Sequence, residues 1–148
     1  MERRIYIYNR EGEYTGYVRI GTDPIGQTVG EVYTPQADRL GAIRYEPLQF
    51  APEQSLVYDP EGIQVGEVHL ESYDNSTIGG TVYRVGPDGA VGGVVAHVLQ
   101  DPDSGDDAQV RKQVENGERL GALKAENISR EELVVVGGGA ALLTLIPQ

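Results

Sequence analysis

The sequence predicts a single all-β domain, a radial or barrel-like array of about five antiparallel β-hairpins of about 25 residues each. Three observations predict it: a constant repeat, 20 glycines in 148 residues, and turn residues between short β-branched stretches. Glycine at about twice its usual share is typical of many tight turns, because glycine adopts positive φ freely. The length suits one domain, residues 1–148, and is too short for two comfortable ones.

The repeat is marked by tyrosines that recur every 25 residues, each after a β-branched residue: Tyr8, Tyr33, Tyr58 and Tyr83. Eight residues after each of the first three stands a glycine, followed two residues later by an aliphatic side chain; these glycines are Gly16, Gly41 and Gly66. A degenerate fifth copy around Gly121 repeats the Arg-Leu-Gly-Ala segment that surrounds Gly41. The predicted hairpins lie near residues 5–20, 30–45, 55–71, 80–98 and 110–125.

Each copy contains a strand, a turn and a return strand. In a turn such as residues 59–62 (Asp-Pro-Glu-Gly), proline presets φ, aspartate caps the turn and glycine takes the left-handed position. The return strand alternates, with Gly16 and Val18 on one face and Tyr17 and Arg19 on the other. A glycine that recurs on the inward face predicts crowding there, by a tyrosine ring or by another backbone. Because a lone hairpin is unstable, the copies are expected to pack side by side or to close into a ring.

The C-terminal tail, residues 134–146, is apolar on all sides. Residues 134–136 (Val-Val-Val) are expected to form a strand, and residues 137–139 (Gly-Gly-Gly) a flexible break. Residues 140–146 are expected to form a short helix that plugs the centre of the hairpin ring, because alanine and leucine favour helix and no polar face is present. The alternative is a closing strand that pairs with residues 134–136. Upstream, Ser129 with Glu132 three residues later indicates the start of a helical turn.

These motifs resemble a known family. Repeated Tyr-x-x-x-Gly-x-x-x-Gly-x-Val hairpins, followed by a Gly-Gly-Ala-Ala-Leu-Leu tail, look like the small bacterial "beta flower" type of hairpin-repeat protein. The likeness covers roughly residues 5–125 and the tail. It implies a radial arrangement of β-hairpins and carries over no established activity. The chain departs from the family in its longer connections and in its acidic segment 101–107.

The charge and the composition limit the classes of partner and chemistry. A net charge of −11 argues against nucleic acid or an anionic membrane surface as partner. The chain has no cysteine, which excludes disulfides, thiolate catalysis and cysteine-ligated metals. The first residues lack the apolar stretch of a signal peptide, and no apolar run approaches the ~20 residues that span a bilayer. The expectation is a cytoplasmic protein without membrane contact.

Basic residues recur at one position of the repeat. Three residues after the glycine, four copies hold Arg19, Arg44, His69 and Lys124, and His97 lies near this position in the remaining copy. In a radial array these residues would form a ring or stripe of basic groups suited to a small anionic ligand. The other interpretation is that each is a solvated strand residue paired with a glutamate such as Glu67 or Glu71.

Other signals for chemistry are weak. The repeated tyrosines are expected to pack in the core or between hairpins, rather than to form a stacking surface for sugars or peptides. Asp101, Asp103, Gly105 and Asp107 have the spacing of a calcium loop, but its twelfth position is Lys112 instead of glutamate. Residues 137–139 lack the Lys-Ser/Thr of a phosphate-binding loop. No catalytic residue, cofactor or metal is therefore predicted.

The sequence accordingly predicts a non-enzymatic structural or protein-interaction module, with a protein partner or with itself. The alternative is a binder of a small anionic ligand through Arg19, Arg44, His69 and Lys124. An acid–base hydrolase is a third hypothesis, which a deep pocket with two close carboxylates would favour.

Overall fold

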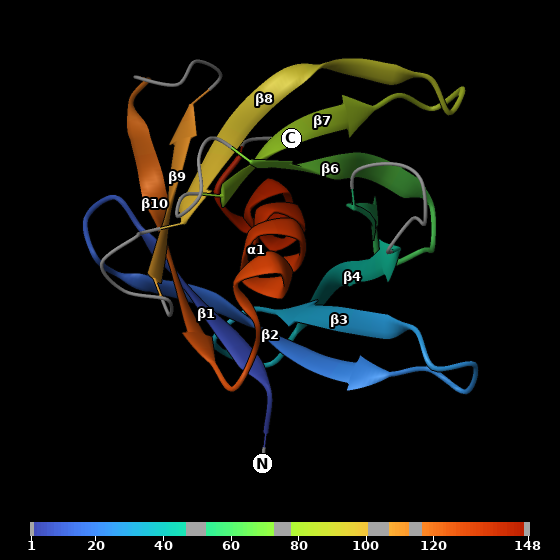
Figure 1. Ribbon diagram of the computed structural model, residues 1–148, viewed down its shortest axis with the longest axis horizontal. Helices are drawn as coiled ribbons and strands as arrows, with labels where there is room; N and C mark the ends of the chain where they lie inside the picture. Colours follow the sequence, from blue (N-terminus) through green and yellow to red (C-terminus); the bar gives the residue numbers. More distant parts are fainter. Residues whose placement is uncertain (1, 47–52, 73–77, 101–106, 113–116, 147–148) are drawn as a thin grey trace.

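The computed structural model describes residues 2–46, 53–72, 78–100, 107–112 and 117–146. Ten antiparallel strands close into a barrel around one helix, as Figure 1 shows. The strands are β1 (Arg4–Asn9), β2 (Tyr14–Thr22), β3 (Thr28–Tyr33), β4 (Arg39–Glu46), β5 (Gln54–Tyr58), β6 (Gln64–Ser72), β7 (Ile78–Val85), β8 (Val91–Gln100), β9 (Asp107–Lys112) and β10 (Arg119–Glu126). The helix α1 (Arg130–Thr144) runs through the middle of the barrel. This is the predicted all-β array with a central C-terminal helix.

The sheet order follows the chain, with β1 and β10 pairing to close the ring. Each odd-numbered strand and the strand after it form one hairpin, so the five expected hairpins are β1–β2, β3–β4, β5–β6, β7–β8 and β9–β10. The acidic segment with the calcium-loop spacing lies outside the described residues except for Asp107, which begins β9.

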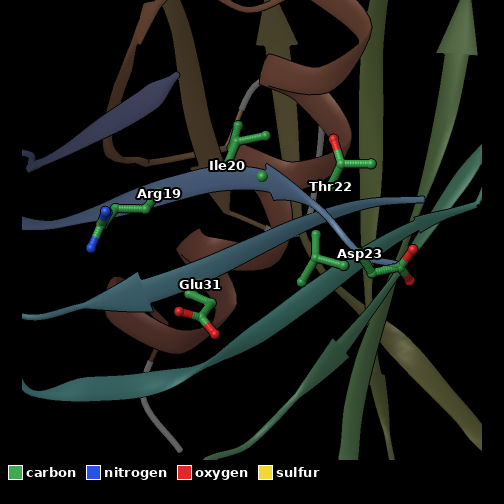
Figure 2. A pocket seen from close by; sticks show the side chains of 7 residues that line it. Arg19, Ile20, Thr22, Asp23 and Glu31 are labelled. Atoms are coloured by element: carbon green, nitrogen blue, oxygen red, sulfur yellow. The ribbon is translucent and has the colours of Figure 1, made fainter. Parts of the chain in front are cut away.

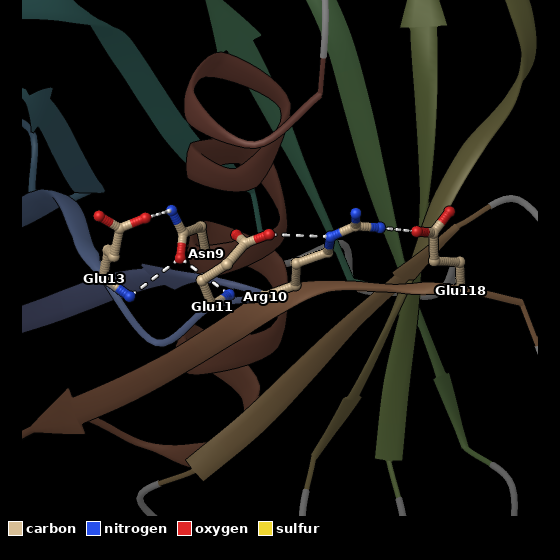
Figure 3. Close-up of polar contacts among 5 residues, drawn as sticks. All are labelled: Asn9, Arg10, Glu11, Glu13 and Glu118. Atoms are coloured by element: carbon tan, nitrogen blue, oxygen red, sulfur yellow. Dashed lines mark hydrogen bonds and ion pairs between the residues drawn. The ribbon is translucent and has the colours of Figure 1, made fainter.

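The hairpin turns have the predicted chemistry. In the first hairpin, the Oδ1 of Asn9 accepts hydrogen bonds from the backbone N–H of Glu11 (3.0 Å) and Glu13 (2.9 Å), as Figure 3 shows. Gly12 completes this turn with a φ of 82°, in the left-handed region that favours glycine. Arg10, at the tip, ion-pairs with its neighbour Glu11 and with Glu118, which precedes β10. The tips of the first and last hairpins are thereby joined across the closure of the ring.

The same turn recurs in other hairpins. Asp59 accepts hydrogen bonds from the N–H groups of Glu61 and Ile63, and Gly62 has a φ of 84°. In the second hairpin the equivalent left-handed position is held by Ala37, with a φ of 70°. A side chain with a Cβ is strained there.

The core lies between the inner face of the barrel and α1. Alternate strand residues point inward and are fully buried, among them Ile5, Val18, Val32, Ile43, Val57, Val68, Val82, Val98 and Val110. Ser129 caps α1 and forms a capping box with Glu132, as predicted. Ten consecutive helix residues, 133–142, are buried, so α1 is enclosed on all sides. Among the described residues, no helix has the length and apolarity to cross a membrane.

The predicted division of the tail is wrong. Residues 134–136 form no strand, residues 137–139 form no break, and the closing-strand alternative is also excluded, because α1 continues without interruption through all of them. The reason is the lack of space for side chains at the glycine positions of the helix. A Cβ at Gly139 would come within 2.8 Å of Val57 Cγ2 and 3.0 Å of Ile43 Cγ1. Glycine costs about 1 kcal/mol in a helix relative to alanine, and packing of a bare backbone against the barrel wall outweighs that cost.

The crowding predicted at the return-strand glycines comes from another backbone. A Cβ at Gly16 would lie 2.7 Å from the carbonyl oxygen of Tyr33, and one at Gly66 would lie 2.9 Å from that of Tyr83. The last turn of α1 and the residue after it cover the same glycines from inside: Leu142 over Gly66, Leu143 over Gly41, Thr144 over Gly16 and Leu145 over Gly121. These glycines therefore let the next hairpin and the helix approach closely.

Candidate functional site

The four basic residues predicted as a binding set all lie on the outer face of the barrel. They belong to β2, β4, β6 and β10, and at least one other strand lies between any two of these strands. Arg19, Arg44 and Lys124 are exposed and His69 is half-buried. The strand register pairs each with different neighbours and brings no two of them together; Arg44, for example, lies opposite Val29 and Leu56.

The contacts of His69 agree with the interpretation in which each basic residue pairs with a glutamate. Its Nε2 lies 3.0 Å from Glu67 Oε2, and its ring centroid lies 4.7 Å from that of Tyr83. Across β6, β7, β8 and β9 the register aligns His69 with Thr81, His97 and Arg111. The structure thus places the two histidines on either side of Thr81. In the part of the chain that the structure describes, no group of three His, Asp or Glu side chains could hold a metal ion.

Arg19 lines a hollow of about 430 Å³ on the outer face. Figure 2 shows Arg19 and Glu31 on neighbouring strands at one side of this hollow, with Asp23 at the end of β2 on the other. Asp23 is engaged in its turn, because its Oδ1 accepts the N–H groups of Ile25 (3.0 Å) and Gln27 (2.9 Å). Glu31 is engaged as well, because its Oε2 accepts the hydroxyl group of Tyr33, which leaves Arg19 as the charged group that can face a ligand here.

A second, smaller hollow of about 130 Å³ adjoins the first, since Arg19 and Ile20 line both. Its other lining residues are Glu2, Arg3 and Arg4. Lys124 lies elsewhere, in a hollow of about 350 Å³ together with Tyr8, Asp107 and Arg119. The structure therefore groups Arg19 with Arg4 and Arg3 instead of with Arg44, His69 or Lys124.

Five tyrosines lie on the outside of β1, β2 and the strand next to it, β3, in two groups that the pairing of Tyr6 with Tyr17 places side by side. We call this the tyrosine face; its members are Tyr6, Tyr8, Tyr14, Tyr17 and Tyr33. The ring of Tyr14 lies 6.2 Å from that of Tyr6 and 5.9 Å from that of Tyr8. Tyr17 and Tyr33 are stacked, with ring centroids 5.3 Å apart. The guanidinium of Arg4 lies 5.3 Å from the centroid of the Tyr17 ring, within the range of a cation–π interaction.

Of the two expected locations of the repeated tyrosines, the core and the contacts between hairpins, the structure excludes the core. Tyr8, Tyr33, Tyr58 and Tyr83 are half-buried on the outer face, because the neighbouring β-branched residues take the inward positions. Packing between hairpins is confirmed for two of them. Tyr33 stacks on Tyr17 of the first hairpin, and Tyr83 contacts His69 of the third.

Two phenols of the tyrosine face, those of Tyr14 and Tyr33, have a raised pKa and stay protonated at neutral pH. The hydrogen bond from Tyr33 to Glu31 (2.6 Å), followed by burial, raises the pKa of Tyr33. Burial raises the pKa of Tyr14, although this side chain is 41% exposed. A neutral phenol can both donate and accept a hydrogen bond beside its apolar ring, so the face can meet polar as well as apolar groups.

Sequence reasoning missed most of this surface. Arg4, Tyr6 and Tyr14 do not lie at the recurring tyrosine position, so the search for repeated residues passed over them. The available signal was the alternation of residues 4–8 (Arg-Ile-Tyr-Ile-Tyr), which is typical of a half-buried strand with an aromatic outer face. Which strands flank that face depends on the pairing of β1 with β2 and of β2 with β3.

Comparison with known proteins gives no match: no family model, no curated protein and no solved structure matches this chain. The tyrosine face and the two hollows beside Arg19 are therefore the features on which a function can be based.

Proposed function

We propose that this chain is a non-enzymatic interaction module whose tyrosine face binds another polypeptide chain. The observation that supports it is the two neighbouring clusters of ring contacts, five tyrosines and Arg4 in all, on the outside of three adjacent strands. Tyrosine and arginine are enriched in protein–protein interfaces and among the residues that contribute most to binding. The net charge of −11 supports a polypeptide over a nucleic acid as partner.

The closed barrel favours docking through side chains. Every strand that the structure describes has a neighbouring strand on both sides, so a partner cannot extend the sheet by adding a strand. The interior is filled by α1, which leaves the outer face as the contact surface. Ring contacts hold the tyrosines of the face in place before binding, and side chains ordered in advance lose less entropy when a partner binds.

We also propose a relationship to the beta flower type of hairpin-repeat protein. It is supported by the arrangement of five hairpins around a central C-terminal helix. That relationship carries no activity, so it is compatible with an interaction module and does not identify the partner.

The test is selection of peptides from a phage-displayed random library on the immobilised protein. Peptides that bind the native chain are expected to bind the double variant Tyr14→Ser/Tyr17→Ser at least about tenfold more weakly. A tenfold loss corresponds to about 1.4 kcal/mol, which the removal of a single interface tyrosine can cause. Tyr58→Ser is the matched control, because Tyr58 occupies the repeated position on the outside of β5, away from the tyrosine face. Circular dichroism would establish that each variant folds.

Two results would contradict the proposal. One is equal binding of the selected peptides to the native chain and to the double variant. The other is turnover of a substrate in a broad hydrolase panel that is abolished by replacing one acidic or histidine residue. Sedimentation of the native chain and the double variant adds a further arm: a dimer that dissociates on loss of the two tyrosines would identify the partner as a second copy.

A further inference from the structure

We infer that the hollow between Arg3, Arg4 and Arg19 binds a phosphate group, at a site that adjoins the tyrosine face and shares Arg4 with its contacts. Its volume of about 130 Å³ is enough for one tetrahedral oxyanion. Three of its five lining residues are arginines, in a chain with 12 Lys and Arg residues against 23 Asp and Glu residues. Such a local excess of positive charge favours an anion.

The strand register brings two of these arginines together. Arg4 lies directly opposite Arg19 in the pairing of β1 with β2. Like charges directly opposite each other destabilise a sheet, and an anion between them would relieve the repulsion. Glu126 lies opposite Arg4 on β10 and Glu31 lies opposite Arg19 on β3, so acids flank the pair, but neither lines the hollow.

The donors of Arg4 are oriented before a ligand arrives. Its guanidinium lies over the ring of Tyr17, and one Nη atom lies 2.9 Å from Glu2 Oε2. Among the described residues, the Nε of Arg4 is buried and has no hydrogen-bond acceptor within reach. Each guanidinium presents five N–H donors in a planar fork. Forks from Arg4 and Arg19 suit the oxygens of a phosphate better than the two oxygens of a carboxylate, which one arginine can already satisfy.

Glu2 is an internal competitor for this site. Its carboxylate lines the hollow and pairs with Arg4, but its side chain is 60% exposed. An exposed ion pair is weak, so a dianionic phosphate can displace it. Arg3 is held differently, by an ion pair with Glu132 at the start of α1, which fixes one wall of the hollow.

The experiment is a titration of the full chain with inorganic phosphate at constant ionic strength and slightly alkaline pH, followed through the Arg Nε–Hε signals in nitrogen–proton correlation spectra. We expect the signals of Arg4 and Arg19 to shift. The affinity for phosphate should fall at least about tenfold in Arg4→Gln and in Arg19→Gln. It should rise severalfold in Glu2→Gln. Arg44→Gln is the matched control, because Arg44 is the exposed arginine at the same repeat position on β4 and lines neither hollow. It should bind as the native chain does.

Three results would overturn the inference: no shift of these signals, unchanged affinity in Arg4→Gln and Arg19→Gln, or an equal loss in Arg44→Gln, which would indicate unspecific charge. Acetate should bind more weakly than phosphate, and equal affinity would refute the tetrahedral class. A short phosphoserine peptide distinguishes the sources of the group. Tighter binding than inorganic phosphate would assign the site to a phosphorylated polypeptide, and equal or weaker binding would assign it to free phosphate; both results support the site.

Discussion

The carbonyl oxygen of Tyr8 lies against Gly121, so close that a Cβ atom at Gly121 would overlap it. These residues belong to the first and last strands of the sheet, β1 and β10, whose pairing closes the barrel. The same contact joins Gly16 to Tyr33, Gly41 to Tyr58 and Gly66 to Tyr83. Ring closure therefore uses the same glycine–carbonyl contact that joins one hairpin to the next.

Replacing this glycine should weaken the closure of the barrel. Gly121→Ala is expected to destabilise the fold by about 3 kcal/mol, the upper part of the usual range for overpacking, because the obstructing atom is backbone and cannot rotate away. Urea unfolding followed by circular dichroism would measure the change. Gly21→Ala is the control, since a Cβ there meets nothing within 4 Å, and it should change stability by less than about 0.5 kcal/mol. Similar losses in the two variants would contradict this role of Gly121.

The central glycines of α1 should reverse the usual effect of a glycine-to-alanine change. In an exposed helix the change stabilises by about 1 kcal/mol. Gly139→Ala is expected to destabilise by about 1–3 kcal/mol, because its Cβ would press on Val57 and Ile43. Thermal unfolding would show the loss. A stabilised Gly139→Ala protein would mean that the helix is not confined as described.

The turn of the second hairpin should tolerate glycine better than its native residue. Ala37 holds a φ of 70°, which costs an L-residue about 1–2 kcal/mol. Ala37→Gly removes that strain but makes the unfolded chain more flexible, so the expected net gain is about 0.5–1 kcal/mol. Chemical denaturation measures it. The reverse change in the equivalent turn, Gly62→Ala, should cost about 1 kcal/mol, and a loss in both variants would argue against the strain at Ala37.

The carboxylate of Glu132 should make stability fall in acid. Burial alone would raise its pKa, but the hydrogen bonds from Arg3 and from Ser129 outweigh burial and lower the pKa below its ordinary value. A lowered folded-state pKa adds stability above the unfolded pKa, and this stability is lost as the pH falls through the folded value. Glu132→Gln is therefore expected to reduce stability at neutral pH and to flatten its decline in acid.

The measurement for Glu132 is urea unfolding of the native chain and Glu132→Gln across the acidic range. Glu61→Gln, at an exposed turn, serves as control and should leave the pH profile unchanged. A profile of Glu132→Gln parallel to that of the native chain would show that Arg3 and Ser129 do not hold this carboxylate in its charged form.

The local parts of this protein could be predicted from its sequence. The repeated strand, turn and return strand predicts the five hairpins, and Asn9 or Asp59 with the following glycine predicts the turns, because these preferences act over a few residues. Arg19 was found because its repeat position marks an outward strand residue, and Ser129 because a capping box is a local motif.

The functional surfaces could not be predicted in the same way. Arg4 meets Arg19, and Tyr33 meets Tyr17, only through the register of neighbouring strands. The repeat grouped Arg19 with Arg44, His69 and Lys124, and the closed sheet separates them, because equivalent positions of a ring point away from one another.

The hairpins, their turns and the outward position of the recurring basic residues follow from the amino-acid sequence, because they depend on short-range preferences. The helical state of residues 137–139 and the meeting of the aromatic and arginine side chains of β1, β2 and β3 follow from the folded barrel. Both of these features depend on what surrounds the chain. At residues 137–139 the barrel wall leaves space only for a helix backbone without side chains. Strand pairing selects which side chains become neighbours.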